Sequence, residues 1–546
     1  MPFKSKFWAR SACLSSAVLA LVLFGSGREV FASGQTPATQ QTAAPAIPPV
    51  GAAAGQTGPV SRLSADEAVR MALENNLGIQ AERLSPQINT FAVAGARAAY
   101  APVLFSNFFN RNSTQPPSTF ISGSGSLLTT ESLTQDGGLA QNIPWGGGNY
   151  SLSLSGGKVT TSSIDSRYNP QLSSNLSARI VQPLLRNFKT DSFRQQIETT
   201  QNNQVIADLD LRERVTVTSQ AVRNAYFDLI GAIEGHKVAV QSLELAQDQL
   251  KSNRTKVEVG TLAPIDIIEA EAEVASNEEA VINAEARIKS VEDRLRYLIL
   301  NPSQPDFWTM RIEPTDAPAM TPIAIDVDAA IANALAQRTD IARLKKQLDN
   351  IDVGIKFAQN QKMPGLDLTA NYNVIGVAGT QLEFGQGFPP PVLNTSIRSF
   401  KDALTDVLGQ DFRTWSVALA FSYPLGTSQA DATLASNRLQ RQQGAVTLRD
   451  LELLVATGVR DAARQVETNV KRVEATQKAR DRAERRLEAE NKRMTVGLSS
   501  TFQLFQAQRD LARQRQQEVN ALIDYNRSVI NFESIQIAPS GGGGGR

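Results

Sequence analysis

The chain has 546 residues, of which 41% are hydrophobic and 20% are charged, with 55 basic against 54 acidic side chains. This balance leaves no excess of positive charge, so nucleic acid is not expected as a partner. The mean hydropathy is −0.22, and no stretch after the N-terminus approaches the roughly 20 apolar residues of a membrane-spanning helix, which excludes a polytopic helical membrane protein.

The N-terminal segment has the pattern of an export signal. Three basic side chains within the first ten residues precede an apolar run over residues 12–24, and Ala32 offers a small residue before a cleavage point. Residues 1–32 are therefore predicted to be a secretory signal peptide; an N-terminal anchor helix is the alternative, for which the run is short. The only cysteine, Cys13, precedes the apolar run, so neither lipid attachment nor a disulfide is expected in the mature chain.

Three segments have compositions that bury little apolar surface. Residues 33–60 are predicted to be a flexible lead-in, residues 302–322 a proline-rich linker, and residues 539–546 a flexible glycine-rich tail. The linker divides the remaining chain into a first half, 61–301, and a second half, 323–538.

The two halves repeat one another. The stretch "LSADEAVRMAL" at residues 63–73 aligns with "IDVDAAIANAL" at residues 325–335, and further landmarks follow in the same order. Each half reads helix, Pro, strand, long loop, strand, Pro, helix, glycine turn, helix, so an internal duplication fits best. Proline cannot continue a helix and keeps the preceding residue extended. The prolines predicted at junctions between helix and strand are Pro102, Pro183, Pro364 and Pro424.

Long helices with heptad patterns are predicted on either side of the glycine turns. A seven-residue ladder of mainly apolar positions runs through residues 215–257, and another runs through residues 267–295. In the second half Val459, Val466 and Val473 share one register. Strict heptads favour left-handed supercoiling of packed helices. A helix of roughly 60 residues would span on the order of 90 Å.

Several segments alternate with a period of two, as strands do. In "TWSVALAFSYPLG", residues 414–426, large apolar side chains alternate with small or weakly polar ones, and aromatic residues mark both ends. Residues 150–155, 175–180 and 366–374 alternate in the same way. This is the pattern of a membrane β-barrel strand, and only a closed barrel satisfies every backbone group in lipid. From the strands alone, a soluble sandwich remains the alternative.

The duplicated architecture, the segments "QPLL" and "YPLG" after strands, and the two glycine turns together resemble the TolC-like outer-membrane efflux and secretion channels. The resemblance covers about Leu63 to Ile537. It implies an α+β membrane protein in the bacterial outer membrane that extends into the periplasm. In this family a homotrimer shares one twelve-stranded β-barrel, with four strands from each chain, which is continuous with a periplasmic α-helical barrel. The implied partners are outer-membrane lipid, a periplasmic adaptor protein and an inner-membrane pump.

One departure from the family bears on the strand count. The segment between Pro102 and Pro183 in the first half is longer than the corresponding segment between Pro364 and Pro424 in the second. The excess contains "IPWGGGNY", which could form an additional hairpin turning at residues 146–148, so the count of four strands stays open in this half. The triple glycine is no phosphate-binding loop, because no Gly-Lys-Ser/Thr follows it.

The sequence offers no catalytic, cofactor or metal site. His236, the only histidine, lies on an apolar heptad register and is interpreted as a packing or pore-facing residue. A zinc site has no support from the spacing of potential ligands, and no nucleophile has a credible base. Asp266, Glu269 and Glu273 share one helix face beside the first glycine turn, where a solvated face is an equally good interpretation from sequence alone.

The resemblance adds roles for the two turns, which form the periplasmic tip in the family. Asp266 matches the acidic gate position, with Glu269 beside it, and the corresponding second-tip positions hold Gln503 and Gln506 instead of acidic residues. The turns that match the adaptor-contacting tips are Val259, Gly260 and Thr261 in the first half and Val496, Gly497 and Leu498 in the second.

The predicted function is therefore a passive export conduit without enzymatic activity. It would be the outer-membrane channel of a tripartite efflux or type I secretion system. The leading alternative is a barrel-anchored trimeric coiled-coil protein with a structural or adhesive role, and a soluble periplasmic enzyme comes third. The exported substrate, the class of pump and the polar residues that close the gate are left open.

Overall fold

The computed structural model describes residues 59–116, 127–164, 166–317, 320, 324–387 and 390–539. The predicted signal peptide, all but the last residues of the lead-in, and the tail from residue 540 lie outside the described residues. The chain divides into two units, residues 1–56 and 57–546, and all described residues belong to the second.

Helices of matched length occur in the same order in both halves. The first half contains α1 (Ala65–Asn75), α2 (Leu77–Ala98), α3 (Ser192–Glu258) and α4 (Ile265–Ile299), with 11, 22, 67 and 35 residues. The second contains α5 (Val327–Gln337), α6 (Thr339–Gln361), α8 (Gln429–Thr495) and α9 (Thr501–Ser534), with 11, 23, 67 and 34 residues. The duplication itself stays a prediction. A further short helix, α7 (Phe400–Gly409), lies between strands of the second half.

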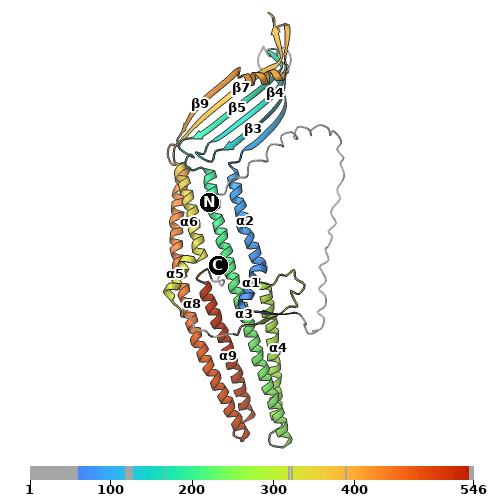
Figure 1. Cartoon of the computed structure of the whole chain (residues 1–546), viewed down its shortest axis with the longest axis vertical. Helices are drawn as coiled ribbons and strands as arrows, with labels where there is room; N and C mark the ends of the chain where they lie inside the picture. The colour runs from blue at the N-terminus through green and yellow to red at the C-terminus, as the bar shows by residue number, and fades with distance from the viewer. Residues whose placement is uncertain are drawn as a thin grey trace, which may run out of the picture. The chain divides into compact units, whose positions relative to one another are not determined.

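The long helices pack along their predicted heptad positions. Val222 and Leu229 of α3 and Val459 and Val473 of α8 have no exposed surface. Helix α3 contacts α1, α2, α4, α6 and α9, while α8 contacts α5, α6 and α9 (Figure 1). At about 1.5 Å per residue, helices as long as α3 and α8 extend on the order of 100 Å. None of the described helices is both long and apolar enough to cross a lipid bilayer.

The predicted linker is more ordered than its prolines suggest. It contains β6 (Arg311–Pro314), which pairs in parallel with β1 (Val60–Leu63). Phe307 and Ile312 from this stretch are buried in the core formed with α1, α3 and α4. The buried Glu292 of α4 accepts a hydrogen bond from the backbone N–H of Ile312 at 2.7 Å. Apolar side chains thus hold the segment in place although its composition resembles a linker.

Seven strands form one antiparallel sheet within the described residues. They are β2 (Val103–Gln115), β3 (Leu128–Asn142), β4 (Asn149–Thr161), β5 (Tyr168–Pro183), β7 (Gly365–Phe384), β8 (Val392–Arg398) and β9 (Phe412–Ser422). The strand order is β2-β3-β4-β5-β7. The outer side of β7 then pairs with β9 along residues 365–375 and with β8 along residues 379–384 (Figure 1).

The strand count corrects the four strands that the resemblance implies. Strands β3 and β4 form the additional hairpin of the first half, and β8 is the third extra strand. The hairpin turns where the glycines predict it: Gly146 and Gly147 have φ of 72° and 67°, and Ile143 N–H donates to the Gly148 carbonyl at 2.7 Å. Glycine adopts this left-handed backbone without the steric cost that other residues carry.

Candidate functional site: an apolar sheet face and two helical turns

The registers of the sheet place most of its large side chains on one face, with Phe105, Phe109 and Phe412 as exceptions on the other. A single row of directly opposed residues crosses six strands, from β2 to β9: Leu104, Leu139, Leu152, Ala178, Tyr372 and Trp415. We call the side of the sheet that carries this row the apolar face. The neighbouring row, on the opposite side, is smaller and more polar: Val103, Ala140, Ser151, Arg179, Asn371 and Ser416.

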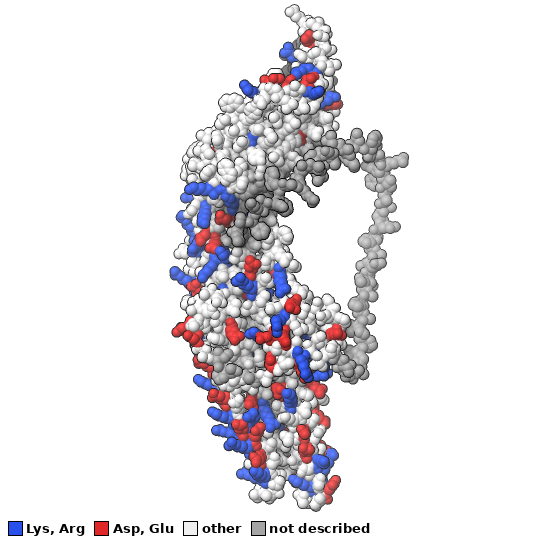
Figure 2. All heavy atoms as spheres, viewed as in Figure 1, with Lys and Arg blue, Asp and Glu red and all other residues white. Residues whose placement is uncertain are grey.

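The part of the apolar face nearer the helices is exposed although its side chains are large, whereas Val374 and Ala378, farther along the same face of β7, are fully buried. Leu104 is 82% exposed, Trp415 71%, Phe421 69% and Leu419 61%. Figure 2 shows that charged side chains are sparse over the strands and frequent over the helices. An apolar patch this continuous marks a surface that lipid or another protein covers.

The four predicted prolines lie at the ends of strands. Pro102 stands between α2 and β2, and Pro364 stands between α6 and β7. Pro183 is the last residue of β5, and Pro424 follows the end of β9 on the way to α8. These positions are the predicted ones. The loops from β5 to α3 and from β9 to α8 are both short, so the strands connect closely to the long helices.

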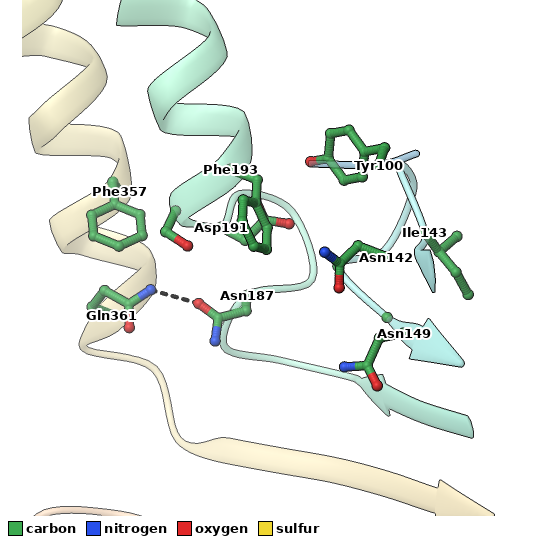
Figure 3. Close-up of a pocket in the computed structure, with 12 residues that line it drawn as sticks. Tyr100, Asn142, Ile143, Asn149, Asn187, Asp191, Phe193, Phe357 and Gln361 are labelled. Carbon is green, nitrogen blue, oxygen red and sulfur yellow. Dashed lines mark hydrogen bonds between the residues drawn. The ribbon is translucent and has the colours of Figure 1, made fainter. Parts of the chain in front are cut away.

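A hollow of about 300 Å³ lies at this junction between helices and sheet. Figure 3 shows it between Phe193 at the start of α3, Gln361 at the end of α6 and the β3–β4 turn. Gln361 donates to Asn187 at 2.6 Å (Figure 3). Asp191 caps α3 by accepting from the Arg194 N–H at 2.8 Å. The Gln361–Asn187 bond ties the end of α6 to the loop before α3, and the lining residues form no catalytic arrangement.

The first glycine turn joins α3 to α4. Gly260 has φ of 79°, and the Thr261 N–H donates to the Lys256 carbonyl at 2.8 Å, which ends α3. Val259, Gly260 and Thr261 are all exposed, and Val259 is 73% exposed. Behind the turn, the fully buried Asn253 donates to the backbone carbonyl of Asp266 at 3.3 Å. This amide therefore fixes the reversal while the tip faces solvent.

The second glycine turn joins α8 to α9 in the same manner. Gly497 has φ of 75°, and the Leu498 N–H donates to the Arg493 carbonyl at 2.9 Å. Val496 and Leu498 are 66% and 77% exposed. Ser500 caps α9 by accepting from the Gln503 N–H at 3.3 Å. Both tips thus present exposed residues around a left-handed glycine, with one apolar residue, Val259, at the first tip and two, Val496 and Leu498, at the second.

The predicted gate residues divide between the two tips. Asp266 lies in the first turn of α4 and is half-buried, whereas Glu269 is exposed; no ion pair reaches either of them from the described residues. Gln503 and Gln506 are exposed near the start of α9, and Gln503 accepts from the Ser499 hydroxyl at 3.0 Å.

Glu273, on the same face as Asp266, differs from its neighbours because it has a basic partner. Its carboxylate lies 3.5 Å from the Arg509 guanidinium of α9, so this pair links the two tips. Sequence reasoning missed Arg509, because only the packing of α4 against α9 brings the two residues together. His236 lies elsewhere on α3, with Nε2 3.8 Å from Glu285. In the described part of the chain no cluster of potential ligands could hold a metal ion.

An antiparallel sheet with an exposed apolar face, joined to helices far too long for a compact domain, defines an outer-membrane protein with a helical extension. The chain belongs to the outer membrane efflux protein family, whose family model matches residues 149–299 and 330–535. It is an outer-membrane efflux channel, located in the outer membrane and reaching into the periplasm. No curated protein is significantly similar to it in sequence.

Solved structures support the same fold. The Campylobacter jejuni outer membrane channel CmeC has a TM-score of 0.62 at 14% identity, over 87% of this chain and 85% of that one. The Vibrio cholerae outer membrane protein VceC has 0.60 at 13% identity, over 87% and 96%. The Neisseria gonorrhoeae MtrE outer membrane channel, in its open state, has 0.58 at 16% identity, over 87% and 89%. Within this fold, the described residues of the chain form a sheet of seven strands, whereas the resemblance implies four.

Proposed function

We propose that three copies of this chain form one passive export conduit, as part of a tripartite efflux or type I secretion system. The observation that carries the proposal is the apolar face, which continues across six strands and is joined to paired helices that end in glycine turns. Lipid is the cover that fits this face, since a bilayer requires outward apolar side chains and a polar interior on alternate residues.

The helices would carry the conduit through the periplasm. A single chain exposes long apolar positions such as Leu453 and Leu454 on α8, at 68% and 61%. Neighbouring copies would cover such positions by packing helix against helix around a common axis. A helical wall shared by three chains would account for the exposed apolar positions that α8 keeps within one chain.

The two turns would receive the periplasmic adaptor. Val259 and Leu498 are exposed apolar residues at the ends of otherwise charged helices, and both turns share the same left-handed glycine geometry. Two similar tips per chain would offer six similar contact points around a trimer. The pump of the inner membrane would supply the energy, so the conduit itself needs no catalytic site.

Asp266 and Glu269 would form the cation-favouring part of the periplasmic entrance. Both lack an ion-pair partner among the described residues, and a three-fold axis would bring three copies of each together. Gln503 and Gln506 would line the second tip without charge. Glu273 would contribute less, because the Arg509 guanidinium 3.5 Å away offsets its charge.

The test is the isolation of the full-length protein from outer membranes in detergent. We expect a particle of three chains that forms ion-conducting pores when reconstituted into planar bilayers. A soluble monomer in the periplasmic fraction would contradict the proposal, and so would a trimer without any conductance. A trimer that resists extraction and extends a stalk from the cell surface would support the structural or adhesive alternative.

A further inference from the structure

Two open edges, those of β2 and β9, border the part of the sheet next to the helices, and the outer side of β8 is also unpaired among the described residues. Within the described residues β2 pairs only with β3, and β9 pairs only with β7. The outer edges of β2, with 13 residues, and of β9, with 11, therefore have backbone N–H and C=O groups without a strand partner. Lipid offers such groups no hydrogen-bond partner, so both edges require a partner strand.

The β3–β4 hairpin is a full part of this sheet. Its strands extend along the whole of their neighbours: Val103 at the start of β2 lies opposite Ala140, and Val181 near the end of β5 lies opposite Asn149. Its turn is therefore level with the ends of the other strands, at the junction with the helices.

The turn of the hairpin is also anchored at that junction. Gln141 and Asn142 donate to the backbone carbonyls of Tyr100 and Ala99, both at 2.9 Å. Gln182 of β5 donates to the Gly146 carbonyl at 2.7 Å. A β-carbon at Gly147 would lie 2.2 Å from the Asn187 carbonyl oxygen, so the loop before α3 packs directly on the turn. The hairpin is thus held by its pairing with β2 and β5 and by the contacts of its turn.

The row of large side chains nearest the helices continues across the hairpin. Leu139 and Leu152 lie within the row that runs from Leu104 to Trp415, while Ser151 and Ser153 point to the opposite side. Leu152 is 46% exposed, and Leu154 on the same face of β4 is 45% exposed. A hairpin that lay in the lumen or in an outer loop would have no reason to match this pattern.

Strand directions allow the two edges to join between copies. Each strand from β2 to β9 is antiparallel to its neighbour. Because this series has six strands, an even number, β2 and β9 run in opposite directions. Strand β9 of one copy would therefore be antiparallel to β2 of the next. Within one chain the sheet is not closed, because β2 pairs with β3 and β9 with β7, and no pairing joins β2 to β9 in the described residues. The second copy of this chain is therefore the partner that the edges fit.

A barrel shared by three copies, as the family implies, requires β2 of each copy to pair with β9 of the next. We propose that the β3–β4 hairpin is part of this shared wall, which gives six strands per chain. This inference rests on the proposed trimer, in which the wall has eighteen strands instead of the family's twelve. Strand β8 stands outside this count, because it pairs only with the far part of β7 and continues beyond the end of β9.

Disulfide trapping tests the edge contact. The chain's only cysteine, Cys13, lies in the predicted signal peptide, so engineered pairs would be free of background. Phe108→Cys on β2 would be combined in turn with Trp415→Cys, Val417→Cys or Leu419→Cys on β9. We expect at least one pair to give covalent dimers and trimers that reductant dissolves. Phe108→Cys with Ala418→Cys, on opposite faces, is the control and should give none; absence of product from all three pairs would overturn the edge contact.

The strand count is tested by electron cryo-microscopy of the detergent-extracted trimer and by a pair of substitutions in the hairpin. We expect eighteen strands in the wall, impaired membrane insertion of Leu152→Arg, and insertion of Ser153→Arg close to that of the unchanged protein. A conducting trimer with twelve strands, in which Leu152→Arg inserts normally, would overturn this inference and leave the proposed function intact. A soluble monomer without conductance would contradict both.

Discussion

Asp431 connects the start of α8 to the end of α6 at the junction below the sheet. Its carboxylate lies 2.7 Å from the Lys362 ammonium and accepts hydrogen bonds from the Ser428 N–H and hydroxyl, at 3.2 and 2.7 Å. The Lys362 contact, followed by the two bonds from Ser428, lowers the pKa of Asp431 from 3.8 to about 2. One residue thus caps the helix and ties two helices together.

A lowered pKa in the folded state gives a defined pH dependence. The stabilising contribution of Asp431 is complete above its ordinary pKa of 3.8 and is lost as the pH falls through about 2. We expect Asp431→Asn to lower the thermal midpoint at pH 7, and the difference from the unchanged protein to shrink between pH 4 and pH 2. Melting curves in detergent across this range measure it. Asp450→Asn, at an exposed position of the same helix, is the control, and a pH-independent difference would refute the assignment.

At the scale of elements, alternation predicted the strands well where it was strict. The faces of β7 and β9 follow from residues 366–374 and 414–423 alone, and the glycine turns follow from Gly260 and Gly497. Strand β3 was predicted only in part, because its central Gly137 and Gly138 interrupt the alternation. Strand β6 was missed since prolines flank it, and its order depends on contacts with α4 that no local pattern reveals.

The two faces of β9 should respond differently to charge. Leu419 lies on the apolar face and is 61% exposed, whereas Ser416 accepts a hydrogen bond from Asn371 at 3.2 Å on the opposite side. Leu419→Arg should destabilise the inserted protein by about 2–4 kcal/mol if it lies near the bilayer midplane. Ser416→Arg should change the stability of the inserted protein much less. Folding titrations into lipid vesicles measure both, and equal effects would favour a protein core over lipid against this face.

At the scale of the whole molecule, sequence alone could place the gate candidates on two tips but not describe their surroundings. The positions of Asp266 and Gln503 relative to their turns follow from the repeat. The pairing of Glu273 with Arg509 does not, because it joins helices more than 200 residues apart in the sequence. At the proposed entrance, the net charge would therefore depend on contacts between the halves as well as on composition.

Charge at the entrance should control selectivity for ions. Asp266→Asn should reduce cation selectivity and weaken block by multivalent cations, because three carboxylates would be removed from one ring. Gln503→Asp should strengthen the block. Glu488→Gln is the matched control, since Glu488 is exposed on α8 and paired with Lys492 at 2.7 Å, so it should change little. Planar-bilayer recordings measure the selectivity and the block. Unchanged selectivity in both Asp266→Asn and Gln503→Asp would show that these residues do not line the constriction.

The open edges of β2 and β9 also bear on how the protein reaches the membrane. A lone chain would enter lipid with two rows of bare backbone groups, so its insertion would depend on assembly with other chains. Biogenesis would then be steeply dependent on local concentration. A chain with one disrupted edge would also act as a dominant-negative variant. If it were co-expressed in equal amounts with the intact protein, only about one trimer in eight would contain three intact chains.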